Sequence, residues 1–348
     1  MIKINVNTMP KYDVLIGKNL LENTANFIKE VGLTGKVLVI TDKTVDKLYS
    51  KVVIDNLQAN GFDVFKYVIK GGEKSKSGKD YLKILEFLAK NQFTRSDFLI
   101  ALGGGVVGDL TGFVASTYLR GIPFVQIPTT ILAFADSSVG GKTAINLKAG
   151  KNLAGAFYQP KLVICDVSTA KTLPKEEYAN GMAEVIKYGM LFDKDFIKSL
   201  LNENDLESAI AKSVEWKKKV VESDEKDNAE RQLLNFGHTL GHAIEKESGF
   251  KISHGSAVAI GMRIITQKAV NKGLCDMNCL GLLDALLTKY NLPTKTDIKI
   301  EKLVNTTLID KKRKGDYITI VMPKELGVCK LEKMPIEEWK DFILKDEN

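Results

Sequence analysis

The stretch DFLIALGGGVVGDLTGFVAS, residues 97–116, joins an apolar run, a glycine-rich turn and a segment of helical spacing. The apolar run has the length of a buried strand, and the small and apolar residues after Asp109 indicate a helix. Glycines between a strand and a helix let the backbone approach a pyrophosphate, whose charge the helix N-terminus favours. The run departs from GxGxxG, so it predicts a variant dinucleotide site. A tight turn that needs glycine at positive φ is the alternative explanation.

Segments on both sides of this turn alternate in the same way. Apolar, β-rich runs separated by longer amphipathic segments occur at residues 36–42, 62–69, 97–105, 124–130 and 161–166. This alternation is typical of βαβ units around a parallel sheet. From about residue 173 to 290 apolar residues recur at helical spacing, and strand signals return only at 316–323. We therefore predict a Rossmann-like α/β nucleotide-binding domain over residues 1–170, a mainly α-helical domain over 171–348, and a ligand cleft between them.

Length and composition narrow the class of protein. A chain of 348 residues is too long for one ordinary core, which also favours two domains. The formal net charge of +7 suits either nucleic acid or a small anionic substrate. Basic runs at 217–219 and 311–314 lack the interleaved aromatics of a single-strand binding groove, so we expect no nucleic-acid partner.

Cellular location is predicted from the N-terminal segment and the cysteines. No apolar window is long enough to span a membrane, and the first residues lack the features of a signal peptide. Four cysteines without CxxC spacing fit a reducing compartment. Cys275 and Cys279 lie one helical turn apart and could hold a metal, but buried thiols are the simpler explanation. We expect a cytoplasmic protein with no membrane partner.

All three histidines of the chain, His238, His242 and His254, lie within one short region. His238 and His242 share one face of a helix, and a glycine before each indicates that something packs closely there. Such a concentration predicts a metal site. Glu184 lies on an otherwise apolar helix face, where a carboxylate is costly unless it is paired or binds a metal. A His/His/Glu set is typical of catalytic zinc, but spacing alone leaves open which histidines bind it.

Polar residues elsewhere indicate an anionic ligand. Asp42 ends a strand, where it could bind a ribose or cap the next helix, and Thr129 and Thr130 present the same alternatives. Several cations occupy loops and helix faces in the same regions. These cations are Arg120, Lys142, Lys151, Lys187, Lys217 and Arg231. Together they suggest a phosphorylated substrate.

Further motifs span about residue 71 to 262. They read GGEKSKS, ALGGGVVGDLTGFVASTYLRG, IPTTILAFADSSVGGKTAIN, GKNLAGAFYQP, NGMAEVIKYG, LLNFGHTLGHAIE and HGSAVAIGM. In this order the motifs closely resemble the 3-dehydroquinate synthase family of sugar-phosphate cyclases.

The resemblance implies a role for each matching residue. Glu184, His238 and His254 would bind Zn²⁺ or Co²⁺, and His242 would be an acid–base group instead of a ligand. NAD would contact Asp42, Gly71, Gly72, Glu73, Lys74, Ser75, Lys76, Gly105, Val106, Val107, Gly108, Asp109, Thr129, Thr130, Lys142, Lys151, Thr169, Ala170, Lys171 and Thr172. Further catalytic groups would be Lys142, Lys187, Lys217, Asp136 and Asn235. The substrate would also meet Arg120, Asn152, Arg231 and a lysine of the 311–314 run, Lys311 or Lys312, of which we choose Lys312.

The implied activity is that of a lyase of the shikimate pathway, which leads to chorismate and aromatic amino acids. Its substrate would be 3-deoxy-D-arabino-heptulosonate 7-phosphate, converted by transient oxidation with NAD, loss of phosphate, reduction and an intramolecular aldol reaction. The family also implies a homodimer. The alternatives are a metal-dependent polyol or glycerol dehydrogenase and another sugar-phosphate cyclase.

Overall fold

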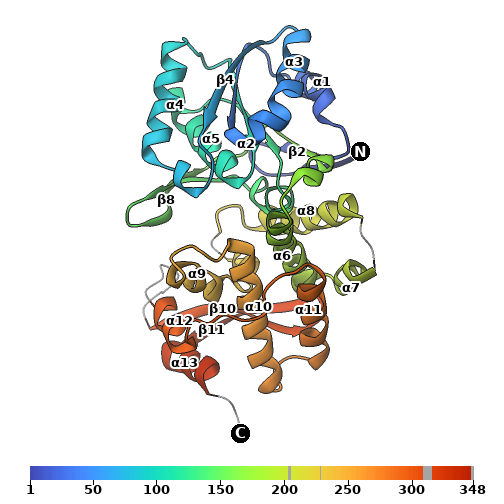
Figure 1. Cartoon of the computed structure of the whole chain (residues 1–348), viewed down its shortest axis with the longest axis vertical. Helices are drawn as coiled ribbons and strands as arrows, with labels where there is room; N and C mark the ends of the chain where they lie inside the picture. Colours follow the sequence, from blue (N-terminus) through green and yellow to red (C-terminus); the bar gives the residue numbers. More distant parts are fainter. Residues whose placement is uncertain (203–204, 228, 309–315, 346–348) are drawn as a thin grey trace. The chain divides into compact units, whose positions relative to one another are not determined.

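The computed structural model describes residues 1–202, 205–227, 229–308 and 316–345. The chain forms two compact units, one of Met1–Leu173 with Leu206–Lys226 and the other of Pro174–Asp205 with Asp227–Asn348 (Figure 1). Within the described ranges, none of the helices is both long enough and apolar enough to cross a membrane.

A seven-stranded sheet forms the centre of the first unit. Its strands are β1 (Ile2–Val6), β2 (Tyr12–Gly17), β3 (Lys36–Asp42), β4 (Asp63–Ile69), β5 (Phe98–Gly103), β6 (Phe124–Pro128) and β9 (Leu162–Asp166). They lie in the order β1-β2-β9-β6-β5-β3-β4, and every neighbouring pair is parallel except β1 with β2. The carboxyl ends of the parallel strands therefore share one edge of the sheet.

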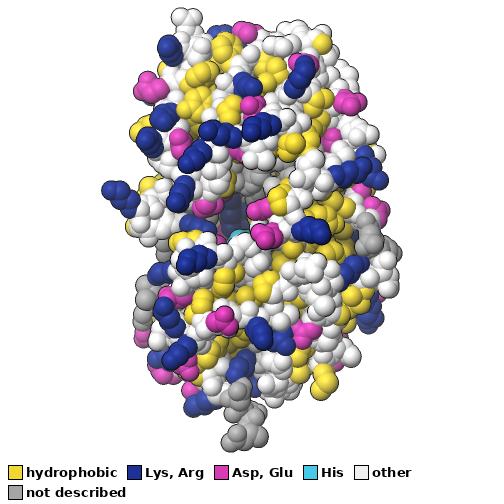
Figure 2. Space-filling view, in the orientation of Figure 1, with side chains coloured by type: hydrophobic (Ala, Val, Ile, Leu, Met, Phe, Trp, Pro, Cys, Tyr) yellow, Lys and Arg dark blue, Asp and Glu magenta, His cyan; other side chains and the backbone are white. Residues whose placement is uncertain are grey.

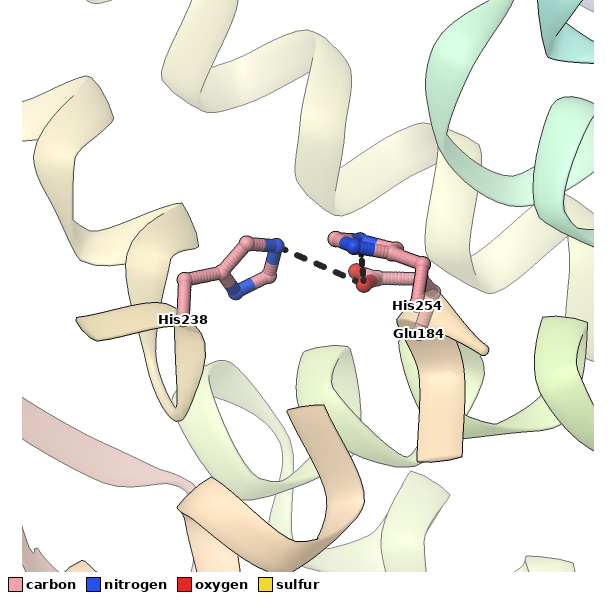
Figure 3. Close-up of side chains that lie close together, drawn as sticks. All are labelled: Glu184, His238 and His254. Atoms are coloured by element: carbon pink, nitrogen blue, oxygen red, sulfur yellow. Dashed lines mark ion pairs between the residues drawn. The ribbon is translucent and has the colours of Figure 1, made fainter. Parts of the chain in front are cut away.

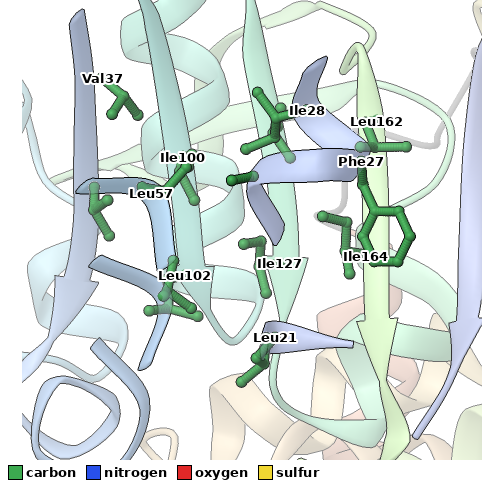
Figure 4. Close-up of a cluster of buried hydrophobic side chains, with 14 of the residues drawn as sticks. Leu21, Phe27, Ile28, Val37, Leu57, Ile100, Leu102, Ile127, Leu162 and Ile164 are labelled. Atoms are coloured by element: carbon green, nitrogen blue, oxygen red, sulfur yellow. The ribbon is translucent and has the colours of Figure 1, made fainter. Parts of the chain in front are cut away.

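Helices cover both faces of this sheet because both faces of its strands are apolar. Val37 and Val39 point into a core with α1 (Thr24–Glu30) and α3 (Lys51–Ala59), part of which Figure 4 shows. Leu38 and Ile40, which alternate with them, point into a second core with α4 (Gly78–Lys90) and α5 (Gly105–Thr117). Strands buried on two faces read as continuous apolar runs, which is the pattern that the sequence shows. The predicted Rossmann-like α/β fold is confirmed.

Smaller elements complete the first unit. They are α2 (Lys43–Val45), the antiparallel hairpin of β7 (Lys142–Leu147) and β8 (Gly150–Phe157), and the short 3-10 or π turns η1 (Leu21–Asn23), η2 (Asp46–Ser50), η3 (Glu73–Ser75), η4 (Tyr118–Arg120), η5 (Ala133–Ser137) and η6 (Val167–Thr172). One long helix, α8 (Leu206–Ser223), returns to this unit after the chain has left it at Leu173. Its Glu222 Oε1 accepts a hydrogen bond of 2.6 Å from the backbone N–H of Asn7.

The second unit is mainly helical, as predicted. Its helices are α6 (Lys175–Phe192), α7 (Lys194–Asn202), α9 (His238–Glu247), α10 (His254–Asn271), α11 (Met277–Lys289), α12 (Ile300–Thr307) and α13 (Ile336–Leu344), with the 3-10 turn η7 (Glu230–Asn235). A hairpin of β10 (Tyr317–Glu325) and β11 (Val328–Pro335) packs with them. α6 is buried at every residue from 179 to 191, because α7, α10, α11 and β11 contact it. Glu184 and Lys187 lie within this buried stretch, so two charged side chains are held in the interior.

Candidate active site

Three helices of the second unit bring a carboxylate and two imidazoles together. Glu184 lies within α6, whereas His238 and His254 are the first residues of α9 and α10. α9 begins at His238 because Gly237, with a left-handed φ of 76°, turns the chain out of η7. In Figure 3 the His238 ring points towards Glu184 and His254, which come from the other two helices.

The two imidazoles face the same oxygen atom. His238 Nε2 lies 3.5 Å from Glu184 Oε1, and His254 Nε2 lies 3.4 Å from it (Figure 3). One donor atom of each residue lies within 4.8 Å of the others. Two donors in a tetrahedral zinc site, each about 2.1 Å from the ion, lie about 3.4 Å apart. Each imidazole nitrogen therefore lies at the donor–donor spacing of a tetrahedral zinc site from Glu184 Oε1.

Burial makes this carboxylate dependent on its charged neighbours. Glu184 has 0% of its surface exposed, and the ammonium of Lys187, 1% exposed, forms an ion pair with Glu184 Oε2. The pair lies one helical turn apart on α6. An isolated carboxylate in such a place would cost several kcal/mol, which the neighbouring cation offsets. Lys187 thus holds one oxygen of Glu184 while the other faces the imidazoles.

The surroundings also set the protonation of the two histidines. Burial lowers the pKa of His238 well below its ordinary value, an effect that outweighs the attraction of Glu184. Burial also opposes protonation of His254, but its hydrogen bonds to Glu184 and Glu245 outweigh burial and raise its pKa to about 9. A neutral imidazole is the form that binds a metal, and His238 is already in that form at neutral pH.

His242 lies beside this group, one turn along α9. Its ring centroid is 5.5 Å from that of His238 and 6.1 Å from that of His254, and its side chain is half-buried. The structure thus brings all three histidines together. Within the described residues, a second group with suitable metal spacing consists of His242, Glu245 and His254.

Two glycines explain how α9 and α10 come so close. A Cβ on Gly241 would lie 3.2 Å from Val258 Cα, and one on Gly261 would lie 2.1 Å from the carbonyl oxygen of Gly237. The inference that something packs closely against the glycine positions is therefore confirmed, and the packing element is α10.

A contact that the sequence analysis missed joins α6 to the start of α10. Asn180 Oδ1 accepts a hydrogen bond from the backbone N–H of Gly255, next to His254. A Cβ on Gly255 would lie only 1.9 Å from the Asn180 carbonyl oxygen. The only signal in the sequence is a polar residue, Asn180, at the start of the apolar stretch of α6. The contact sets the distance between the helices that carry Glu184 and His254.

The residues predicted to bind NAD gather at the carboxyl edge of the sheet in the first unit. Asp42 ends β3, and four other predicted segments follow the ends of β4, β5, β6 and β9. Two predicted residues, Lys142 and Lys151, lie instead on the β7–β8 hairpin. Those segments are 71–76, 105–109, 129–130 and 169–172. Asp42 also caps α2, accepting hydrogen bonds from the N–H groups of Thr44 and Val45 at 2.8 and 3.1 Å. In open α/β sheets this edge is where ligands bind.

The glycine run after β5 serves close packing. No glycine from 103 to 108 has a positive φ. A Cβ on Gly104 would lie 3.1 Å from Thr130 Cγ2, and one on Gly108 would lie 2.7 Å from Gln126 Oε1. The alternative explanation by a turn that requires positive φ is wrong. The glycines instead let the N-terminus of α5 lie against β6 and the residues that follow it.

A buried lysine connects the 71–76 loop with α5 and the β7–β8 hairpin. Lys76, 5% exposed, forms an ion pair with Asp109 and donates a hydrogen bond of 2.5 Å to Asn152 Oδ1. Burial raises the pKa of the Asp109 carboxyl, although the Lys76 ammonium opposes the effect. Glu73 accepts a hydrogen bond of 2.7 Å from Asn146 of the hairpin. Three segments with predicted ligand contacts are thereby joined.

A second buried lysine, Lys217 on α8, belongs to the first unit. Its Nζ lies 2.8 Å from Asp136 Oδ1 and also donates to the Asp136 carbonyl. Both residues are predicted from the sequence to contact the substrate. The structure brings them together and shows that α8 is attached beside η5.

The other predicted residues differ in exposure. Arg231 is buried on η7, and Asn235, which ends η7, donates a hydrogen bond of 3.1 Å to the Gln232 carbonyl. Arg120 and Lys142 are exposed, and Lys151 is partly exposed. Lys311 and Lys312 lie outside the described residues.

Basic side chains do not form a stripe on the face shown in Figure 2. Lys and Arg are scattered there among Asp, Glu and apolar residues. A nucleic-acid-binding surface would gather them on one face or along one helix.

Comparisons with known proteins show the family of the chain. Residues 66–180 match the model of the 3-dehydroquinate synthase N-terminal domain, and residues 181–313 match that of the C-terminal domain. A 3-dehydroquinate synthase of Clostridium acetobutylicum is 44% identical over 341 residues, covering 95% of this chain and 96% of the relative. The chain belongs to the 3-dehydroquinate synthase family. The resemblance stated from the motifs is confirmed.

Solved structures of two other synthases share the fold of this chain. A 2-deoxy-scyllo-inosose synthase complexed with carbaglucose-6-phosphate, NAD⁺ and Co²⁺ superposes with a TM-score of 0.87 at 24% identity, covering 98% of this chain and 99% of the other. A 2-epi-5-epi-valiolone synthase from Streptomyces hygroscopicus subsp. jinggangensis, with NAD⁺ and Zn²⁺ bound, has a TM-score of 0.87 at 23% identity and 96% coverage of both chains. At this identity the likeness concerns the fold alone.

Proposed function

We propose that this protein converts 3-deoxy-D-arabino-heptulosonate 7-phosphate to 3-dehydroquinate and phosphate, with NAD and one divalent cation as cofactors. The observation that carries the proposal is the pair of imidazole Nε2 atoms, 3.4 and 3.5 Å from one oxygen of a fully buried carboxylate, in a chain of this family. NAD⁺ with Co²⁺ or Zn²⁺ in two cyclases of the same fold supports the choice of cofactors.

The donor set fits the proposed metal. Glu184, His238 and His254 would hold Zn²⁺ or Co²⁺, because two imidazoles and a carboxylate with an open fourth position suit a catalytic ion of this kind. The bound ion would act as a Lewis acid towards substrate hydroxyls, and bound NAD would accept and return one hydride. Lys187 would hold Glu184 in place, since its ammonium pairs with Oε2 of that carboxylate.

The chain's own residues would orient NAD at the carboxyl edge of the sheet. The N-terminus of α5 would face the pyrophosphate, which its dipole and free N–H groups favour. The backbone can approach closely at Gly104 and Gly105, where no side chain intervenes. Asp42 would accept from a ribose hydroxyl with the oxygen that the α2 cap leaves available.

His242 is proposed to move protons. Its imidazole lies beside the two proposed metal ligands, and its partial exposure leaves the ring accessible to a bound substrate. An imidazole can accept or donate a proton near neutral pH, which suits the loss and return of protons on a sugar.

Buried cations would hold the phosphate and carboxylate of the substrate. Lys217 has a carboxylate partner, Asp136, in the structure, and Arg231 is buried on η7. Such partners keep an ammonium in a fixed place before an anion arrives. Arg120, Lys142, Asn152 and Lys312 are proposed to complete these contacts.

We further propose a cytoplasmic homodimer that acts as a carbon–oxygen lyase. Four free thiols support a reducing compartment. Light scattering on the purified protein tests the dimer.

One assay separates this function from a polyol dehydrogenase and from other cyclases. The purified protein with Zn²⁺, NAD and the heptulosonate phosphate should release phosphate without accumulating NADH. Stoichiometric NADH would instead support a dehydrogenase. Faster turnover of a different sugar phosphate would support another cyclase.

A further inference from the structure

A buried carboxylate, Glu245 of α9, contacts one of the proposed metal ligands from behind. Glu245 is 5% exposed, and its Oε2 lies 3.1 Å from Nδ1 of His254. Nε2, the other nitrogen of the same ring, lies 3.4 Å from Glu184 Oε1. The His254 ring is therefore held between two carboxylates, one at each nitrogen.

His238 is held in the same manner by a different acceptor. Its Nδ1 lies 3.1 Å from the carbonyl oxygen of Phe236, and its Nε2 faces Glu184. An imidazole that donates its Nδ1–H to an acceptor presents the lone pair of Nε2 on its other side. Both rings therefore turn Nε2 towards Glu184, beside which the ion would bind.

The two histidines differ in how firmly the fold holds them. The His238 side chain is 11% exposed and its acceptor belongs to the adjacent backbone, whereas the His254 side chain is 31% exposed. Water competes more readily for a ring that is partly exposed. A carboxylate acceptor restrains such a ring more strongly than a neutral acceptor does, because charge-assisted hydrogen bonds are stronger.

The contact also distinguishes between the two groups with metal spacing. In the group of His242, Glu245 and His254, Glu245 would itself be a ligand. However, Glu245 contacts His254 through Nδ1, while Nε2 of His254 faces Glu184 together with Nε2 of His238. The observed orientation of the His254 ring therefore favours metal binding by the group that contains Glu184. Glu245 would then accept a hydrogen bond from His254 without binding the metal itself.

We propose that Glu245 is a positioning residue, whose carboxylate orients His254 through Nδ1 so that Nε2 faces the metal bound beside Glu184. This inference rests on the proposed function, because it requires the metal. Outer carboxylates of this kind change metal affinity by about tenfold to hundredfold when they are removed.

The test uses Co²⁺ alone with the metal-free full chain, without NAD or substrate. Glu245→Ala removes the acceptor, and Glu245→Gln keeps a neutral one of the same size. Glu247→Gln is the matched control, because Glu247 also lies on α9 but bonds to Lys302 and Thr306. Co²⁺ affinity and the visible absorption spectrum of the bound ion are measured for each variant, with thermal unfolding to verify folding.

We expect Co²⁺ affinity to fall about tenfold to hundredfold in Glu245→Ala and less in Glu245→Gln, with a changed spectrum in Glu245→Ala. Glu247→Gln should bind like the unaltered chain. If Glu245→Ala matches Glu247→Gln in affinity and spectrum, the inference is overturned while the proposed metal site stands.

One ligand variant, His238→Ala, separates this inference from the proposed function. Complete loss of Co²⁺ in both Glu245 variants, with binding retained in His238→Ala, would make Glu245 a ligand and overturn its positioning role. Failure of the unaltered chain to bind Co²⁺ would instead overturn the proposed function.

Discussion

Replacing Gly255 by alanine should damage the metal site without touching a proposed ligand. The new Cβ would lie 1.9 Å from the Asn180 carbonyl oxygen, and real Cβ contacts are essentially never shorter than 3.0 Å. The start of α10 must therefore move away from α6 by about 1.1 Å, the difference between these two distances. Backbone atoms lie on both sides of the contact, so a side-chain rotation cannot relieve it.

The size of this movement can be compared with the site itself. It is about a third of the 3.4 Å that separates His254 Nε2 from Glu184 Oε1. Metal–ligand distances tolerate deviations of only about 0.2 Å, so His254 and Glu184 can no longer share an ion at good geometry. We expect Co²⁺ affinity to fall at least about a hundredfold, beyond the effect of losing an outer contact. Overpacking of this kind also lowers the free energy of unfolding by about 1–3 kcal/mol.

The assay is Co²⁺ titration of the metal-free protein, combined with denaturant unfolding. Gly281→Ala is the matched control, because Gly281 lies within α11 of the same unit and a Cβ there meets nothing within 4 Å. That variant should gain about 0.5–1 kcal/mol of stability and keep its Co²⁺ affinity. A Gly255→Ala protein that is folded and binds Co²⁺ like the unaltered chain would refute the reasoning.

Two further predictions concern the separate roles of residues in the site. His254→Ala should lose the metal. His242→Ala should keep the metal and turn over about 10²–10⁴ times more slowly, because only proton transfer is removed. Loss of metal from His242→Ala, measured by metal analysis of the purified protein, would contradict this assignment. Lys217→Met should lower kcat/KM for the heptulosonate phosphate about tenfold to hundredfold through loss of one charge-assisted hydrogen bond. The control for it is Lys212→Met, an exposed lysine of α8, and equal kcat/KM for the two variants would remove Lys217 from the substrate site.

The central strands of the first unit are predictable from the sequence because both of their faces are buried. β3, predicted at 36–42, spans Lys36–Asp42, and β5 and β9 lie inside their predicted runs. The sequences of β7, β8 and β11 contain no continuous apolar run that would predict a strand. β7 and β8 contain many small residues. In β11, charged residues interrupt the apolar ones because one face of the strand is exposed.

Periodicity indicates that a helix has a buried face but not which element covers it. The apolar residues of α8 suited a helical domain that continues to the C-terminus, yet this helix packs against β1, β2 and η5 of the first unit. The glycines near 103–108 indicated close approach or positive φ equally well. Only the positions of Gln126 and Thr130 decided between these two explanations.

The sequence by itself determined the class of fold, the family and the presence of three histidines with a buried carboxylate, since these follow from local pattern and residue type. The tertiary structure decided which atoms meet. It places Nε2 of His238 and His254 at one oxygen of Glu184, and it places Glu245 behind His254. The physical reason is that ligand geometry depends on contacts between helices distant in the sequence, such as the one between Asn180 and Gly255, and no spacing along a single helix encodes such a contact.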